Sequence, residues 1–198
     1  LEAEKPVTWT YMLHSLQPME QPGRNWFTTA NGKGTGSARL FCASPVNGSV
    51  TDRFFGPPVD EENKRGGKNP PNWHASVSTA GKLSATRFLT VIEVLPGTGV
   101  PVEPVAEGND RVRLNLGDYT VTAELDPAQS SYLAVEDQTR TSALVCGQAA
   151  REISLGSAHR SAKADGSTLL WEKEQGKAEI FHEETDQLPP ALIHGNRY

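Results

Sequence analysis

Short stretches in which apolar and polar residues alternate run through most of the 198-residue chain, and this period of two constrains its fold more than any other feature. Over residues 7–16, for example, Trp9, Tyr11 and Leu13 share one parity, while most residues of the other parity are polar. No segment of about 12 residues or more combines a helical period with capping residues. The pattern therefore predicts an all-β fold with few or no helices.

Turn residues divide the pattern into about a dozen predicted strands. Residues 24–29 and 38–42 form one predicted hairpin around the turn at 31–34, and residues 111–116 and 119–125 form another. Shorter strands are expected near 131–136, 141–147, 150–155, 168–173 and 177–183. Successive hairpins pair antiparallel, so we expect an antiparallel β-sandwich.

The most apolar stretch, residues 88–95, is apolar on both parities and predicts a strand at the centre of a sheet, buried on both faces. We expect one domain over residues 1–198, with a possible subdivision near residue 126, where the strands become shorter. The chain starts with Leu1 rather than methionine and shows no export signal, which suggests the C-terminal part of a longer protein.

Composition excludes several classes of function. The formal net charge of −5 argues against a nucleic-acid partner, because phosphate binding needs a concentrated basic surface. No apolar run approaches the roughly 18 residues of a membrane span. The five histidines lack the spacing of metal ligands, and no phosphate loop or nucleophile elbow occurs, so we predict no metal and no cofactor. Cys42 and Cys146 are interpreted as buried thiols in preference to a disulfide.

Two aromatic positions are candidates for ligand binding. Trp73 and His74 lie where a long strand-poor stretch, Gly56 to Trp73, ends, and they could together stack on and hydrogen-bond a sugar ring. Arg24 and Trp26 make a similar pair on a predicted hairpin, although an arginine stem covering a half-buried indole explains that pair more simply. These four residues are the predicted substrate-binding set, and no catalytic residue is predicted.

The order of several short motifs resembles the β-sheet segment of heparinase II/III-like polysaccharide lyases. The motifs are the stretch 1–15, which ends in Met-Leu-His-Ser, Asn31-Gly32-Lys33, the run 40–45 and the run 87–91. Together they cover about half of the chain. Beyond residue 95 the similarity is limited to a general character of short strands and hairpins.

The resemblance implies a place in a larger enzyme. Such lyases join an N-terminal helical toroid to a C-terminal β-sandwich and cleave uronate-containing polysaccharides by β-elimination. Their Tyr, Asn and His catalytic groups lie upstream of the matching region, so none is carried over to this chain. The implied partners are an acidic polysaccharide and the upstream toroid, and the implied location is periplasmic or extracellular.

The leading hypothesis is therefore a non-catalytic sandwich that supports such a lyase and contacts sugar. A carbohydrate-binding module is one alternative, with an exposed platform made by Trp26, Trp73 or Trp171. Another is a small enzyme that uses Tyr11 or His14 with Arg24, which would require these side chains to converge. A purely structural adhesion domain is the third.

Overall fold

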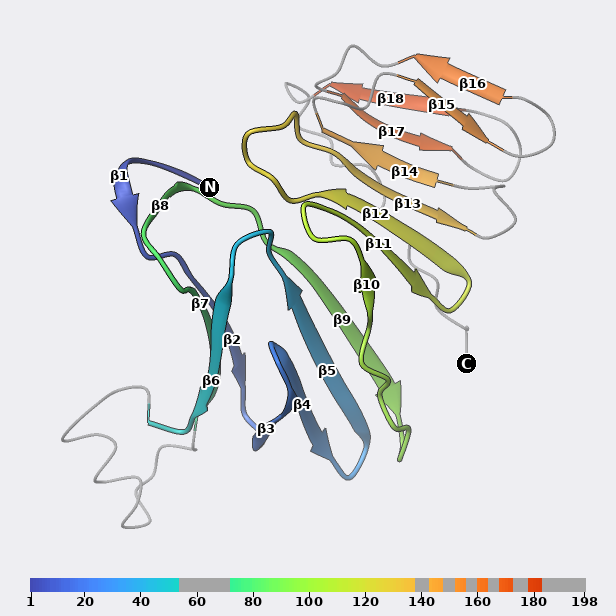
Figure 1. The fold of residues 1–198 in the computed structure, drawn as a ribbon. Coiled ribbons are helices and arrows are strands. Elements are labelled where there is room, and N and C mark those ends of the chain that lie inside the picture. Colours follow the sequence, from blue (N-terminus) through green and yellow to red (C-terminus); the bar gives the residue numbers. More distant parts are fainter. Residues whose placement is uncertain are drawn as a thin grey trace. The chain divides into compact units, whose positions relative to one another are not determined.

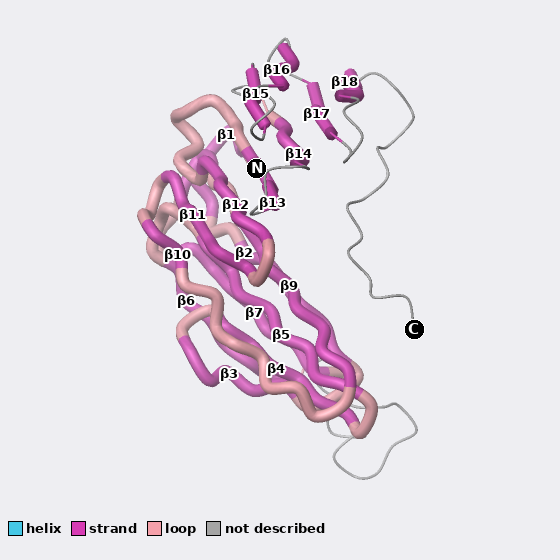
Figure 2. The backbone as a smooth tube through the Cα atoms, turned by 90° about the vertical axis from the view of Figure 1, so that its right-hand side faces the viewer, coloured by secondary structure: helices cyan, strands magenta, loops and turns pink. Residues whose placement is uncertain are grey.

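The structure is a computed structural model that describes residues 1–53, 72–137 and 143–147, and the backbone of the strands at 152–155, 160–163, 168–172 and 178–182. The described residues form strands joined by turns and loops, all strand pairs are antiparallel, and no helix is present among them (Figure 1, Figure 2). The predicted all-β fold is confirmed. The chain divides into two compact units, Leu1–Pro104 and Val105–Tyr198.

The first unit is built from three antiparallel sheets (Figure 1). A three-stranded sheet has the order β2-β7-β6, a four-stranded sheet has the order β3-β4-β5-β9, and β1 pairs with β8. The strands are β1 (Glu2–Val7), β2 (Thr10–Ser15), β3 (Met19–Gly23), β4 (Trp26–Asn31), β5 (Gly34–Phe41), β6 (Val46–Thr51), β7 (Trp73–Thr79), β8 (Leu83–Ala85) and β9 (Leu89–Pro96).

The core of the first unit lies between its two larger sheets. Each of them contributes apolar side chains to one buried cluster, made of Met19, Phe27, Leu40, Val46, Ala75 and Val77. Tyr11, Leu13 and Trp73 pack against this cluster from the three-stranded sheet. Two antiparallel sheets that face each other across a shared apolar core make a β-sandwich, as the alternating pattern predicts.

The second unit contains a seven-stranded sheet with the order β10-β11-β12-β13-β14-β17-β18, and a separate pair, β15 and β16. Its strands are β10 (Ala106–Glu107), β11 (Arg111–Leu116), β12 (Tyr119–Glu124), β13 (Leu133–Asp137), β14 (Ala143–Cys146), β15 (Glu152–Leu155), β16 (Arg160–Lys163), β17 (Thr168–Glu172) and β18 (Ala178–His182). The possible subdivision near residue 126 falls inside this unit, between β12 and β13, and a single domain over 1–198 stays a prediction.

Both predicted hairpins are confirmed, and their turn residues explain them. Asn31 pairs with Gly34 across the β4–β5 turn, where the Asn31 Oδ1 accepts hydrogen bonds from the backbone N–H groups of Lys33 at 2.8 Å and Gly34 at 3.0 Å. At the β11–β12 turn Gly117 has a φ of 57°, in the left-handed region that favours glycine.

The prediction of a central strand at 88–95 is wrong. β9 is an edge strand that pairs with β5, and Ile92 and Val94 are 64% and 77% exposed. Ile92 lies opposite Ala38, on the face of the sheet that carries Phe27, so it points to the core side of the sheet. The buried cluster, however, does not extend as far as β9. An apolar run on both parities gives the length of a strand and not its position in the sheet.

Candidate functional site

An open groove of about 360 Å³ lies on the first unit, along β3, β4 and the start of β5. Its lining is mostly apolar and comes from Pro18, Glu20, Pro22, Trp26, Thr28, Thr29, Ala30, Thr35, Val100 and Pro101. Register places Glu20 opposite Thr28 and Ala30 opposite Thr35, on the face of the sheet that points away from the Phe27 core. The groove is therefore built on the outer face of the four-stranded sheet.

Trp26 lines the groove and is the first residue of β4, directly after the tight β3–β4 turn. Gly23 pairs with Trp26 across this turn, and Asn25 has a φ of 54°, a conformation that asparagine tolerates better than most residues. The Nε1 atom of Trp26 is buried and has no hydrogen-bond partner. The part of the indole that a ligand can reach is therefore its carbon surface.

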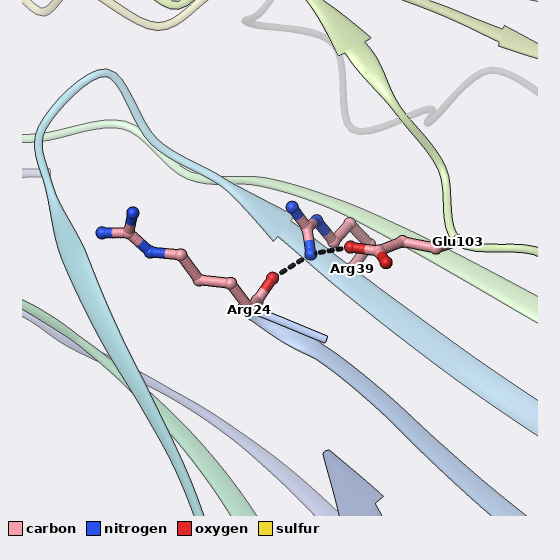
Figure 3. Close-up of polar contacts among 3 residues, drawn as sticks. All are labelled: Arg24, Arg39 and Glu103. Carbon is pink, nitrogen blue, oxygen red and sulfur yellow. Dashed lines mark hydrogen bonds and ion pairs between the residues drawn. The ribbon is translucent and has the colours of Figure 1, made fainter. Parts of the chain in front are cut away.

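The groove is also lined by a segment that follows β9 and is tied down at both ends. At its start the N–H of Gly97 donates to the carbonyl of Lys33 at 2.8 Å. At its end Glu103 forms an ion pair with Arg39, whose guanidinium also donates to the carbonyl of Arg24 (Figure 3). Val100 and Pro101 lie between these ties and line the groove. We call residues 97–104 the strap.

Of the predicted pair Arg24 and Trp26, the structure places only Trp26 at the groove. The Arg24 side chain points away from Arg39 and Glu103 (Figure 3), and its Nη2 donates to the carbonyl of Val46 at 3.3 Å. Arg24 is therefore engaged with the β6 side of the sandwich, and only its backbone carbonyl contributes to the network that holds the strap.

Trp73 and His74 are not brought together as a sugar site. They are successive residues of β7, so their side chains point to opposite faces of the sheet. Trp73 packs against the apolar core. His74 is buried on the other face, in register with His14. The centroids of the two imidazole rings lie 4.5 Å apart, with the ring planes at 71°. The side chain of Trp171 and residues 56–71 lie outside the described part.

The residues of the small-enzyme hypothesis do not converge. Tyr11 points into the sandwich, where its ring lies 6.0 Å from that of Phe88. His14 is three residues later on the same strand and therefore projects from the opposite face, next to His74. Arg24 is bound to the carbonyl of Val46. Among the described side chains, no group of three or more His, Cys, Asp or Glu residues could hold a metal ion.

In the second unit the pKa values of Tyr132 and Cys146 are raised. Burial is the main cause of the raised pKa of Tyr132, and the nearby Glu136 carboxylate raises it further. Arg111, whose guanidinium lies 5.0 Å from the centroid of the Tyr132 ring, lowers it. Burial alone raises the pKa of the Cys146 thiol. Both groups therefore stay protonated near neutral pH and are poor candidates for a base or a nucleophile. Cys42 and Cys146 are both free and half-buried.

The sequence did not single out most of the groove. Glu20, Thr28 and Thr35 are ordinary strand residues, and only the fold brings them beside Trp26. The Pro and Gly residues of the strap indicate a turn, but they do not indicate that it returns across the sheet.

No helix that could cross a membrane occurs in the described ranges. No protein-family model matches the chain, and no curated protein matches it.

Proposed function

We propose that this chain is a non-catalytic β-sandwich of a heparinase II/III-like polysaccharide lyase, and that its groove beside Trp26 binds sugar units of the polysaccharide. The resemblance of the strand motifs supports the family. The groove supports the binding role, and it is the observation that carries the proposal.

The groove fits a sugar in size and in chemistry. Its volume of about 360 Å³ lies within the range of small-ligand pockets, which is roughly 300–1,000 Å³. A sugar ring has an apolar C–H face that can stack on the carbon surface of Trp26. Its hydroxyl groups can pair with the hydroxyls of Thr28 and Thr35 and with the Glu20 carboxylate, all of which belong to the lining.

A catalytic role has less support. β-Elimination needs a base near the proton next to the uronate carboxylate and a second group that neutralises that carboxylate. Tyr11 and His14 project from opposite faces of one strand, and the raised pKa of Tyr132 disfavours it as a base. The 198-residue chain is therefore expected to release no unsaturated uronate by itself.

Replacing Trp26 by alanine should weaken oligosaccharide binding roughly tenfold or more, because a central aromatic side chain is a typical binding hot spot. Isothermal titration would measure this with oligomers of alginate, hyaluronan and heparosan and with their carboxyl-reduced forms. Thr28→Val removes a groove hydroxyl at nearly constant shape and should weaken binding to a smaller degree.

Met12→Ala is the matched control for this experiment. Met12 is 41% exposed on the three-stranded sheet, away from the groove, so its loss should leave binding unchanged. Circular dichroism melts would confirm that the variants fold. Folded Trp26→Ala and Thr28→Val proteins that both bind as well as the unmodified chain would disprove the groove as the sugar site, and lyase activity of the chain would disprove the accessory role.

A further inference from the structure

The charge of the groove points to the kind of sugar that it accepts. Among the described residues that line it, Glu20 is the one charged residue. Two arginines of this unit are engaged elsewhere: Arg39 is paired with Glu103 at the end of the strap, and Arg24 donates to the carbonyl of Val46. Lys33, in the exposed β4–β5 turn, is not among the lining residues. No cation stands among the described residues that line the groove, and Glu20 presents a carboxylate there.

The hydrogen-bonding capacity of the lining also favours a ligand with hydroxyl groups over one with a carboxylate. An ionised carboxylate only accepts hydrogen bonds, so Glu20 needs a donor from the ligand. A sugar hydroxyl is a donor and an acceptor, and it can satisfy Glu20, Thr28 or Thr35. The carboxylate of a uronate is an acceptor only and would meet Glu20 as a like charge.

We infer that the groove selects neutral sugar units over uronates. This inference rests on the proposed function and narrows its substrate class. In a polymer that alternates uronate with a neutral amino sugar, the neutral unit occupies the groove and the uronates lie outside it. A polymer made only of uronates binds least well.

The test compares each uronate oligomer with its carboxyl-reduced form, in which every carboxylate has become a CH₂OH group while the linkages are kept. At low salt the reduced form should bind roughly two- to fivefold more tightly, an effect in the range of one exposed charge interaction. The difference should shrink as salt screens the Glu20 charge.

Glu20→Gln should raise the affinity for the uronate form and bring the affinities for the uronate and reduced forms close together. Glu20 is exposed on an edge strand, so the variant should fold normally. Glu4→Gln is the matched control, since Glu4 is exposed on β1 and lies outside the groove, and removing its charge should leave the preference intact.

Each outcome separates this inference from the proposed function. Tighter binding of the uronate form at a Trp26-dependent site would overturn the neutral preference and leave the sugar site standing. A preference that Glu20→Gln does not change would overturn the role assigned to Glu20. Absence of binding to every oligomer in both forms would overturn the proposed function, and this inference with it.

Discussion

Replacing Gly147 by alanine is expected to destabilise the second unit by roughly 3–5 kcal/mol, the sum of backbone strain and overpacking. Gly147 follows β14 and has a φ of 108°. A Cβ atom there would lie 2.4 Å from the carbonyl oxygen of Ser131 and 2.9 Å from the backbone nitrogen of Tyr132. Both contacts are with backbone where the chain enters β13, so relief requires movement of the strand pair itself.

Gly117→Ala separates the two causes. Gly117 also has a left-handed φ, 57°, but an added Cβ would meet nothing within 4 Å. It should therefore cost only about 1 kcal/mol, the strain of one left-handed alanine. Urea denaturation, with hydrogen exchange of the β13 and β14 amides as the local readout, would compare the two. Equal losses of stability would contradict the close approach at Gly147.

Replacing Phe27 by alanine is expected to lower the free energy of unfolding of the first unit by roughly 3–5 kcal/mol. Phe27 is 1% exposed and belongs to the cluster between the two sheets, where Leu40 from the same sheet and Val77 from the other are equally buried. Deleting its ring would remove apolar contacts and leave a cavity that rigid paired strands cannot close.

Ile92→Ala is the matched control for the sandwich core. Ile92 lies on the same face of the same sheet, opposite Ala38, but it is 64% exposed. Its truncation should change stability by no more than about 0.5 kcal/mol, the usual range for a surface substitution. Thermal and urea unfolding would test both variants. A loss at Ile92 as large as that at Phe27 would show that the core extends to β9, contrary to the structure.

The positions of Phe27 and Ile92 show how far the sequence alone predicts the structure. The alternation that puts Phe27 on one face of a strand is local, and so is the turn chemistry of Asn31 and Gly34 that joins β4 to β5. Both depend on residues close in the chain, and the hairpin predicted from the turn is confirmed. The burial of Phe27 and the exposure of Ile92 depend on how far the second sheet extends, which no local pattern encodes.

The candidate site shows the same limit. The sequence indicated Trp26 by its type, but its groove also needs Glu20 from the preceding strand and Pro101 from a strap more than 70 residues away. The strap is held by the ion pair of Arg39 with Glu103, which is 64 residues distant in sequence. Trp73 and His74 are adjacent in the sequence, which is why the sequence predicts them as one sugar site, but adjacent strand residues face opposite sides of a sheet.

The central hypothesis is that a sugar binds in the groove on the outer face of the four-stranded sheet. The most direct measurement is a titration of the isotope-labelled 198-residue chain with a carboxyl-reduced hyaluronan oligomer, followed by amide and indole chemical shifts. A sugar in the groove will shift the signals of Glu20, Trp26, Thr28, Thr35 and Val100 and leave those of β7 unchanged. Shifts centred on His14 and His74, or no shifts at saturating sugar, would contradict this hypothesis.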